Sequence, residues 1–244
     1  MPLVNGPVDW DRIDLVVFDV DGTLYRQAPV RAHMMVKIGV EVLRNRSLTL
    51  PRLLRRYRQC REELALRPHE DFRRRQYAST AEHMGCAPDE VEALVEEWMQ
   101  LRPLPLLKAS RVEGIDLLFR ALRSTGKMIG IFSDYPADAK LAAMGLEADW
   151  IACAGHAEVG RLKPEPAGLI KLLQWSGVAP ERAILVGDRV DRDWEAGSRA
   201  GVRTIIRSRR SCRHVDSFAR YTDPPFAELL KSRTQLGKAS AYAS

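Results

Sequence analysis

The chain has 244 residues, 45% of them hydrophobic and 29% charged, which is the composition of an ordinary globular protein with a sizeable core. Its four cysteines lie far apart without a C-x-x-C pair, so the sequence predicts neither a disulfide framework nor a zinc site. No apolar run approaches the roughly 18 residues that span a bilayer. Because no signal peptide precedes the first predicted strand, we expect a cytoplasmic protein without membrane insertion.

The first predicted element is a buried β-strand at residues 13–18 (IDLVVF), a short apolar run that ends in an Asp/Gly turn. Similar runs follow at residues 128–132, 150–153, 183–186 and 202–206. Amphipathic stretches of helical length lie beside them at residues 114–123, 137–144, 167–175 and 193–200. Strands that alternate with helices imply βαβ crossovers, so the predicted fold class is α/β, a Rossmann-like parallel sheet with helices on both faces.

Residues 26–107 break this alternation, with apolar residues at helical spacing and no convincing buried strand. We therefore predict a helical cap over residues 26–107, inserted into an α/β core of residues 1–25 and 108–234. Residues 235–244 are small and polar and are expected to form a flexible tail. Within the cap, the sequence predicts turns at residues 45–47 and 66–68, a helix start at 87–90 and a return linker at 102–105.

Positive charge is concentrated in the predicted cap. The formal charge of the chain is +6, and between Arg44 and Arg75 eleven arginines face four acids, which leaves about +7 by subtraction. Arginines on amphipathic helices usually form a solvated face. Two functional alternatives are a substrate with a second anionic group, and contact with nucleic acid or an anionic membrane. Nucleic acid is disfavoured, because only Tyr57, Phe72 and Tyr77 are available there to stack on bases.

Residues suited to phosphate and metal follow four of the predicted strands. In an open parallel sheet, reactive groups collect beyond the carboxyl ends of the strands. The candidates are Asp19 and Asp21 after the first strand, Ser133 after the second, Lys163 in the loop beyond the third, and Asp188 and Asp193 after the fourth. These strand ends are therefore predicted to meet in one site.

The residue types fit phosphoryl chemistry. Asp19 directly follows its strand, which suits a nucleophile that forms an aspartyl phosphate. Asp21 points to the same side of an extended chain, where its carboxyl group can act as general acid and base. Gly22 allows a sharp turn that brings backbone amides near the phosphate. Crowded carboxylates repel one another unless a cation lies between them, so Asp19 and Asp188 are candidate ligands of Mg²⁺.

The same residues resemble the motifs of the haloacid dehalogenase (HAD) superfamily, in its phosphatase branch. Residues 19–24 (DVDGTL) look like the first motif, 131–133 (IFS) the second, 163–166 (KPEP) the third, and 186–188 (VGD) with Asp193 the fourth. These motifs occur in the family's order, each at a predicted strand end or in the loop beyond it. The insertion after the first motif is similar to the helical caps of phosphoglycolate phosphatase-like members.

The resemblance implies a role for each motif residue. Asp19 is the expected nucleophile and Asp21 the expected acid/base, and Mg²⁺ is held by Asp19, the backbone carbonyl of Asp21 and Asp188. Family spacing favours Asp193 over Asp191 as the further acid of the fourth motif. The predicted phosphate-binding set is Ser133, Lys163, Gly22, Thr23 and Asp134, the last standing where the family often has Asn.

The sequence therefore predicts a Mg²⁺-dependent phosphomonoester hydrolase that acts on a small phosphorylated metabolite. Asp21 argues against dehalogenation, because the halogen-removing branch lacks this acid. One alternative is a sugar phosphomutase or phosphotransferase with the same aspartyl phosphate. Another is a non-catalytic regulatory or binding module for an anionic partner. Neither the substrate nor the oligomeric state follows from the sequence.

Overall fold

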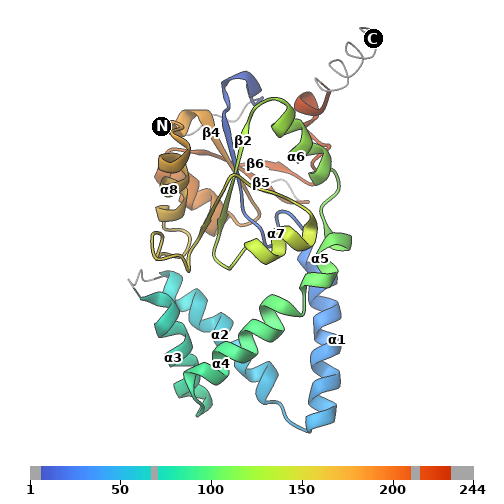
Figure 1. The fold of residues 1–244 in the computed structure, drawn as a ribbon, viewed down its shortest axis with the longest axis vertical. Helices are drawn as coiled ribbons and strands as arrows, with labels where there is room; N and C mark the ends of the chain where they lie inside the picture. The colour runs from blue at the N-terminus through green and yellow to red at the C-terminus, as the bar shows by residue number, and fades with distance from the viewer. Residues whose placement is uncertain (1–6, 67–70, 210–214, 232–244) are drawn as a thin grey trace.

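The computed structural model describes residues 7–66, 71–209 and 215–231. Its centre is a six-stranded sheet in the order β3-β2-β1-β4-β5-β6, in which every neighbouring pair is parallel (Figure 1). The strands are β1 (Leu15–Phe18), β2 (Met128–Ser133), β3 (Trp150–Cys153), β4 (Ala183–Gly187), β5 (Arg203–Arg207) and β6 (Asp216–Phe218). The predicted α/β class and the five predicted strands are confirmed, with ends that differ by one or two residues.

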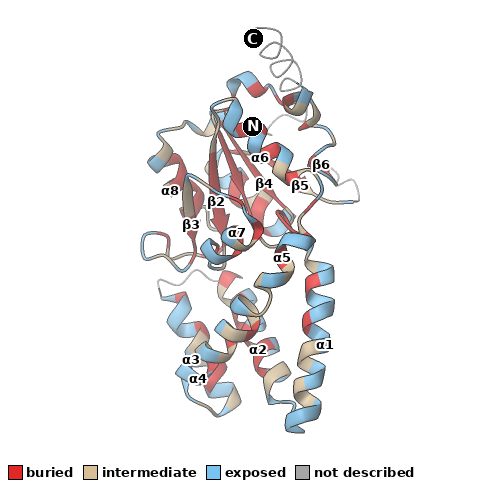
Figure 2. Ribbon diagram, turned by 45° about the vertical axis from the view of Figure 1, so that its right-hand side comes forward, coloured by how far each residue is buried: buried red, intermediate tan, exposed pale blue. Residues whose placement is uncertain are grey.

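Alternate side chains of β1 enter two hydrophobic layers, one on each face of the sheet. Leu15 and Val17 pack with α8 (Ala167–Ser176) and α9 (Glu195–Ala200), whereas Val16 and Phe18 pack with α6 (Ile115–Ser124) and α7 (Asp138–Met144). All four side chains are fully buried, and Figure 2 shows burial along the central strands. A parallel strand that is covered on both faces is apolar at every position for this reason.

Residues 27–110 form a helical assembly beyond the carboxyl ends of the strands (Figure 1). We call these elements the inserted helices. They are α1 (Gln27–Asn45), α2 (Thr49–Leu66), α3 (Phe72–Met84), α4 (Pro88–Val95), the π-helical segment η2 (Glu96–Leu101) and α5 (Leu104–Ser110). The predicted turn at residues 45–47 is confirmed, since Arg46 ends α1 in the left-handed conformation. The predicted helix start at residues 87–90 is confirmed by Pro88 at the first position of α4.

Two hydrogen bonds join the segments that connect the inserted helices to the core. The N–H of Arg26 donates to the carbonyl of Ser110 at 2.8 Å, and that of Val112 donates to the carbonyl of Leu24 at 3.0 Å. The chain therefore leaves and re-enters the core at one place. The division at residues 25/26 and 107/108 stays a prediction, and its second boundary falls inside α5. The predicted tail at residues 235–244, and most of the predicted turn at residues 66–68, lie outside the described residues.

Two elements of the structure were not predicted from the sequence. The predicted return linker at residues 102–105 contains the start of α5, because Pro103 is the N-cap and Pro105 lies in the first turn, where a helix does not need the missing N–H group. Strand β6 has only three residues and pairs with the edge strand β5. Short 3₁₀ turns complete the fold at η1 (Trp10–Arg12) and η3 (Pro180–Arg182).

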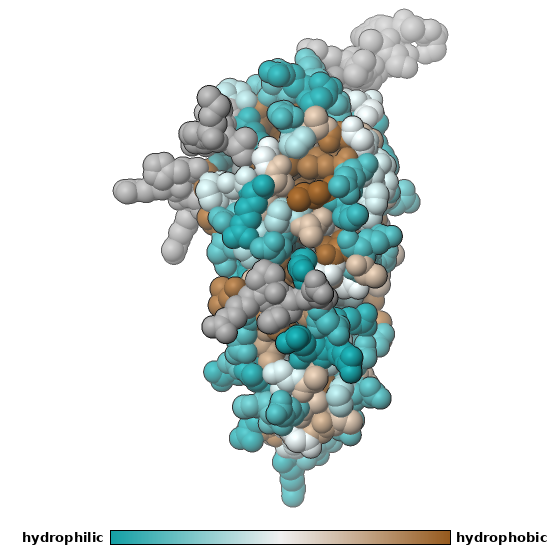
Figure 3. All heavy atoms as spheres, turned by 90° about the vertical axis from the view of Figure 1, so that its left-hand side faces the viewer, coloured by the Kyte–Doolittle hydropathy of each residue, from teal (hydrophilic) through white to brown (hydrophobic). Residues whose placement is uncertain are grey.

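The surface is mainly hydrophilic on the face drawn in Figure 3, with apolar side chains gathered toward the end of the molecule that holds the sheet. The inserted helices also carry exposed apolar residues, such as Met35 and Leu43 on α1. Among the described residues, no helix has both the length and the apolar character needed to cross a bilayer.

Candidate active site

One buried lysine joins two aspartates at the carboxyl ends of β1 and β4. The Nζ atom of Lys163 lies 2.7 Å from Oδ1 of Asp19 and 2.7 Å from Oδ1 of Asp193. Asp19 follows β1 directly, and its N–H donates to the carbonyl of Val186 at 2.9 Å, which continues the parallel pairing with β4. All three charged side chains are almost completely buried. The sheet therefore sets the position of Asp19, and the ion pair with Asp19 helps to hold Lys163, which comes from the loop beyond β3.

Asp19, Asp188 and Asp193 form a cluster in which one carboxylate oxygen of each lies within 4.8 Å of the others. With the ammonium of Lys163, three carboxylates and one cation leave a local charge of −2 by subtraction. Oδ2 of Asp19 is buried without a hydrogen-bond partner among the described residues. Hard oxygen donors with excess negative charge and one unpaired oxygen fit the coordination that Mg²⁺ prefers.

The pKa values of the carboxyl groups in the cluster also favour a bound cation. Burial raises the pKa of Asp19 well above its usual value; Lys163 acts in the opposite direction, and repulsion from Asp193 and Asp188 adds to the rise. Burial and the charge of Asp193 raise the pKa of Asp188 to about 6. Additional positive charge at this position would favour the ionised form of both carboxylates.

Two glycines allow the carboxylates to approach the backbone. A Cβ on Gly22 would lie 2.0 Å from Oδ2 of Asp188, and Gly22 also has a φ of +101°. A Cβ on Gly187 would lie 2.3 Å from Cγ of Asp193. Both positions therefore require glycine, because any side chain would displace an acid of the cluster.

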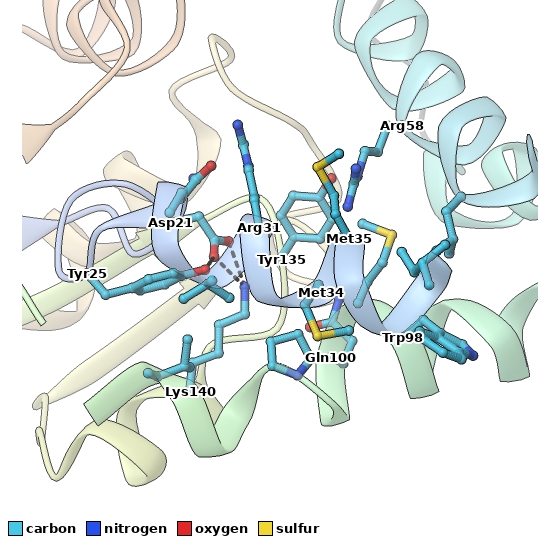
Figure 4. Close-up of a pocket in the computed structure, with 17 residues that line it drawn as sticks. Asp21, Tyr25, Arg31, Met34, Met35, Arg58, Trp98, Gln100, Tyr135 and Lys140 are labelled. Atoms are coloured by element: carbon cyan, nitrogen blue, oxygen red, sulfur yellow. Dashed lines mark hydrogen bonds and ion pairs between the residues drawn. The ribbon is translucent and has the colours of Figure 1, made fainter. Parts of the chain in front are cut away.

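Asp21 is held away from the cluster by residues that the sequence analysis did not single out. Its two carboxylate oxygens lie 2.7 and 2.6 Å from Nζ of Lys140, a buried residue of α7, and Oδ1 also accepts a hydrogen bond from the hydroxyl of Tyr25 (Figure 4). Burial alone would raise the pKa of Asp21, but Lys140 and Tyr25 outweigh it and lower that pKa below its usual value. Asp21 is therefore a carboxylate in this arrangement.

The other predicted phosphate-binding residues lie around the cluster, but not all of them face a cavity. Asp134 does, and its Oδ1 accepts the N–H of Lys163 at 2.9 Å, while burial raises its pKa. The hydroxyl of Ser133 is buried and accepts the N–H of Tyr135 at 3.2 Å. Thr23 is fully buried, and its hydroxyl has no hydrogen-bond partner among the described residues. The phosphate contacts of these residues stay predictions.

The fourth motif continues into a π-helical segment, η4 (Val190–Trp194), before α9. Asp193 turns inward, and its Oδ2 accepts the N–H groups of Asp188 and Arg189 at 3.1 and 3.0 Å. Asp191 is exposed and pairs with Arg189 at 2.6 Å instead. The acid favoured by family spacing is therefore the one that joins the cluster.

Two neighbouring residues of α2 bind the inserted helices to the core loops. Glu62 pairs with Arg189 at 3.0 Å and also with Arg192, whose guanidinium donates to the carbonyl of Lys163. Arg61 is buried, with Cζ 3.9 Å from the centre of the Tyr135 ring. Its guanidinium also donates to the carbonyl of Asp134. These contacts close a pocket of about 450 Å³ between α2 and the cluster, the catalytic pocket.

Residues of the inserted helices are the part of the site that sequence reasoning missed. Arg31 on α1 and Arg58 on α2 line the catalytic pocket, and neither has a hydrogen-bond or ion-pair partner among the described residues. Charge density was a poor guide to them, because in the same arginine-rich region Arg73 pairs with Glu92 on the surface. Lys140 had a usable signal, since it lies on the helix that follows Ser133. Arg67, counted with that region, lies outside the described residues.

Comparison with known proteins gives the class of the chain. The family model of haloacid dehalogenase-like hydrolases matches residues 13–201, so the chain belongs to this family. It is 29% identical to glyceraldehyde 3-phosphate phosphatase of Methanopyrus kandleri, over 79% of this chain and 83% of that protein. It is 30% identical to phosphoglycolate phosphatase of Aquifex aeolicus, over 42% of this chain and 49% of that protein, about half its length. These relatives are phosphatases, and the chain is an enzyme of that type.

The fold has counterparts among solved structures. The HAD-hydrolase YfnB from Bacillus subtilis, in a form bound to magnesium, superposes with a TM-score of 0.62 and 13% identity. The match covers 86% of this chain and 95% of that one. At this level of identity the likeness concerns the fold alone.

Proposed function

We propose that the chain hydrolyses the phosphomonoester of a small molecule, in a Mg²⁺-dependent reaction with an aspartyl phosphate on Asp19. The observation that carries the proposal is the buried cluster of three carboxylates around Lys163 at the carboxyl ends of β1 and β4. The relatives support it, because their names are those of phosphatases of small phosphorylated molecules.

Five residues of the site have a defined task in this reaction. An oxygen of Asp19 attacks phosphorus while the bond to the leaving oxygen breaks, and Lys163 stabilises the charge on the phosphoryl oxygens. Asp21 carries no proton while Lys140 and Tyr25 bind it, so it must take up one proton when the substrate binds. It gives this proton to the leaving oxygen and recovers one from the water that hydrolyses the aspartyl phosphate, so the proton count balances. Lys140 and Tyr25 keep the Asp21 carboxylate in a fixed orientation.

Mg²⁺ fits this donor set. Asp19, Asp188 and the backbone carbonyl of Asp21 would hold the ion. Asp193 would remain paired with Lys163 and would orient the groups around the ion. Bound there, Mg²⁺ supplies positive charge that offsets the charge of the phosphate and of the carboxylates. The contacts of Arg61 and Glu62 with the core would keep bulk water away from the phosphoryl group.

The test is release of phosphate from p-nitrophenyl phosphate with and without Mg²⁺. We expect turnover that a chelator abolishes, and a loss of roughly 10⁴-fold or more in kcat for Asp19→Asn. Asp191→Asn is the control, because this exposed aspartate lies in η4, close to Asp188 and Asp193 in the chain, but outside the cluster. Its kcat should stay within about twofold of the wild type. A wild-type protein that is inert toward this ester and toward a broad panel of phosphorylated metabolites would refute the enzyme proposal.

The same preparation separates the two alternatives. A sugar phosphomutase would convert a hexose 1-phosphate, primed with the bisphosphate, into the 6-phosphate without free phosphate. A non-catalytic binding module would retain the anionic partner without turnover. Release of free phosphate that depends on Asp19 argues against both.

A further inference from the structure

A second cavity, of about 230 Å³, adjoins the catalytic pocket on the side of the inserted helices. We call it the apolar chamber. Its walls are formed mainly by apolar side chains, among them Met34, Met35, Leu54, Trp98 and Met99 (Figure 4). Trp98 is held in place by Arg102, whose Cζ lies 3.9 Å from the ring centre. Methionine and tryptophan provide polarisable surfaces that adapt to apolar or aromatic ligands.

The apolar chamber and the catalytic pocket share a boundary. Five residues line both cavities: Asp21, Gln27, Arg31, Arg58 and Tyr135. The cluster of Asp19, Asp188 and Asp193 lines only the catalytic pocket. A phosphate placed at that cluster therefore has its ester oxygen near Asp21 and the esterified group directed into the apolar chamber.

Polar groups are unevenly distributed around the apolar chamber. Tyr25 and Lys140 line the apolar chamber alone, but both already bind Asp21 at the boundary. Apart from these two and the five boundary residues, Gln100 is the one polar side chain among the described residues that lines the chamber (Figure 4). A sugar with several hydroxyl groups would leave most of them unpaired against methionine, leucine and tryptophan, and each unpaired buried hydroxyl is costly. The chamber therefore favours a body made of carbon and hydrogen.

The two arginines at the boundary match the charge of such a substrate. Arg31 and Arg58 are exposed, and neither has an ion-pair partner among the described residues. Two unpaired cations at the mouth of a cavity attract a dianionic phosphate and keep it out of the apolar end. One end of the substrate is thus selected by charge and the other by apolar contact.

We propose that the natural substrate is a phosphomonoester with an apolar alkyl or aryl body, an inference that rests on the hydrolase activity proposed above. A cavity of roughly 150 Å³ accommodates benzene, so by proportion the apolar chamber holds on the order of nine carbon atoms. Glyceraldehyde 3-phosphate and phosphoglycolate, named for the two relatives, have short polar bodies that would leave this volume unused.

The experiment compares kcat/KM across n-alkyl phosphates from ethyl to dodecyl, with glucose 6-phosphate and 2-phosphoglycolate as polar substrates. We expect kcat/KM to rise about threefold to fourfold per added methylene, the effect of burying one CH₂, and to level off near nine carbons. Acetyl phosphate, an activated mixed anhydride too small to use the apolar chamber, reports the phosphate-releasing activity separately.

Each result bears on a different claim. If acetyl phosphate is hydrolysed while the alkyl series is flat, or while a polar substrate exceeds octyl phosphate in kcat/KM, the hydrolase activity stands and the apolar-substrate inference falls. If acetyl phosphate and every ester are inert, both fall. A rising series with poor turnover of the polar substrates supports the inference.

A matched pair of surface variants tests the chamber without risk to folding. Met35 is 72% exposed and lines the apolar chamber, whereas the adjacent Val36 is 68% exposed and does not line it. We expect Met35→Ser to lower kcat/KM for octyl phosphate about fivefold, the effect of losing contacts with one or two methylenes, and to leave acetyl phosphate unchanged. Val36→Ser should change neither. Equal effects of the two variants on octyl phosphate would overturn the assignment of the chamber.

Discussion

Lys163 and Arg58 are cations that face the same catalytic pocket, yet the molecule holds them in opposite ways. Lys163 is 2% exposed and bound to two aspartates; burial alone would lower its pKa, but those carboxylates outweigh burial and leave the pKa above the usual value. Arg58 is exposed and has no ion-pair partner among the described residues. The core thus provides charges that are fixed before substrate arrives, and the inserted helices provide charges that are still hydrated.

The difference follows from the cost of burying ions. A buried ammonium must be paired, so Lys163 can stay in the core only with its aspartates, and its position is then rigid. A surface arginine keeps its hydration until an anion replaces the water. Rigid, preorganised charge suits the reacting phosphorus, which is common to all phosphomonoesters. Exposed charge beside an apolar chamber suits discrimination between substrates.

The largest expected effect is on the core side. Lys163→Met removes the ammonium with little change in volume, and we expect kcat for p-nitrophenyl phosphate to fall roughly 10²- to 10³-fold. In Mg²⁺-free buffer, the free energy of unfolding by urea should fall by about 3–5 kcal/mol, because buried carboxylates lose their partner. Lys171→Met on α8, which lines neither cavity, is the control. An unchanged kcat would remove Lys163 from the phosphoryl site.

A smaller effect is expected on the side of the inserted helices. The double variant Arg31→Gln, Arg58→Gln should lower kcat/KM about tenfold at low ionic strength and less at high salt, with kcat little changed, because these cations attract the phosphate before chemistry begins. The variant Arg74→Gln, Arg75→Gln removes the same charge from exposed positions that line neither cavity. If both double variants lose activity equally, net charge rather than the position of the arginines is responsible.

The smallest effect is expected where the two regions touch. Glu62→Gln breaks the ion pairs with Arg189 and Arg192 and should lower kcat/KM about threefold, as expected for ion pairs in which the carboxylate is exposed to solvent. Glu63→Gln is the control, since Glu63 pairs with Arg56 inside α2. A larger loss for Glu63→Gln would mean that α2 itself, and not its contact with the core, limits activity.

Acid pH should remove the difference in stability between wild type and Glu62→Gln. Burial alone would raise the pKa of Glu62, but Arg189 and Arg192 lower it below the usual 4.5. The contribution of these ion pairs to stability is therefore present above about pH 4.5 and is lost as the pH falls through the lowered value. The stability of wild type and Glu62→Gln, measured by urea unfolding, should converge at acid pH.

The sheet and the core half of the site were predictable for a common reason. A parallel strand that is buried on both faces is apolar at every position, so residues 15–18 can be recognised as such a strand. An acid such as Asp19 directly after them must then lie at the carboxyl end of the strand. The motifs that contain Lys163 and Asp188 follow other strands and are predicted at the same end of the sheet for the same reason. Strand β6 escaped notice, because three residues without an apolar run carry no periodic signal.

The half of the site on the inserted helices was not predictable, since it depends on how helices cross in space. Trp98 is a buried packing residue, and it also forms a wall of the apolar chamber. Arg31 lies outside the stretch of highest charge density. Arg61, inside that stretch, is buried under Tyr135. No local pattern separates an arginine that faces a cavity from one that faces solvent.

The paired backbone segments at Leu24–Arg26 and Ser110–Val112 have an evolutionary consequence. Because the chain leaves the core and re-enters it through adjacent, hydrogen-bonded residues, the inserted helices are joined covalently to the core at one place. Their further contacts with the core include those of the Arg61 and Glu62 side chains. Helices there can be lengthened, shortened or exchanged without moving Asp19 or the strand that carries it. A lineage can thus acquire a new substrate preference by replacing the inserted helices, while the residues that break the phosphate ester are inherited unchanged.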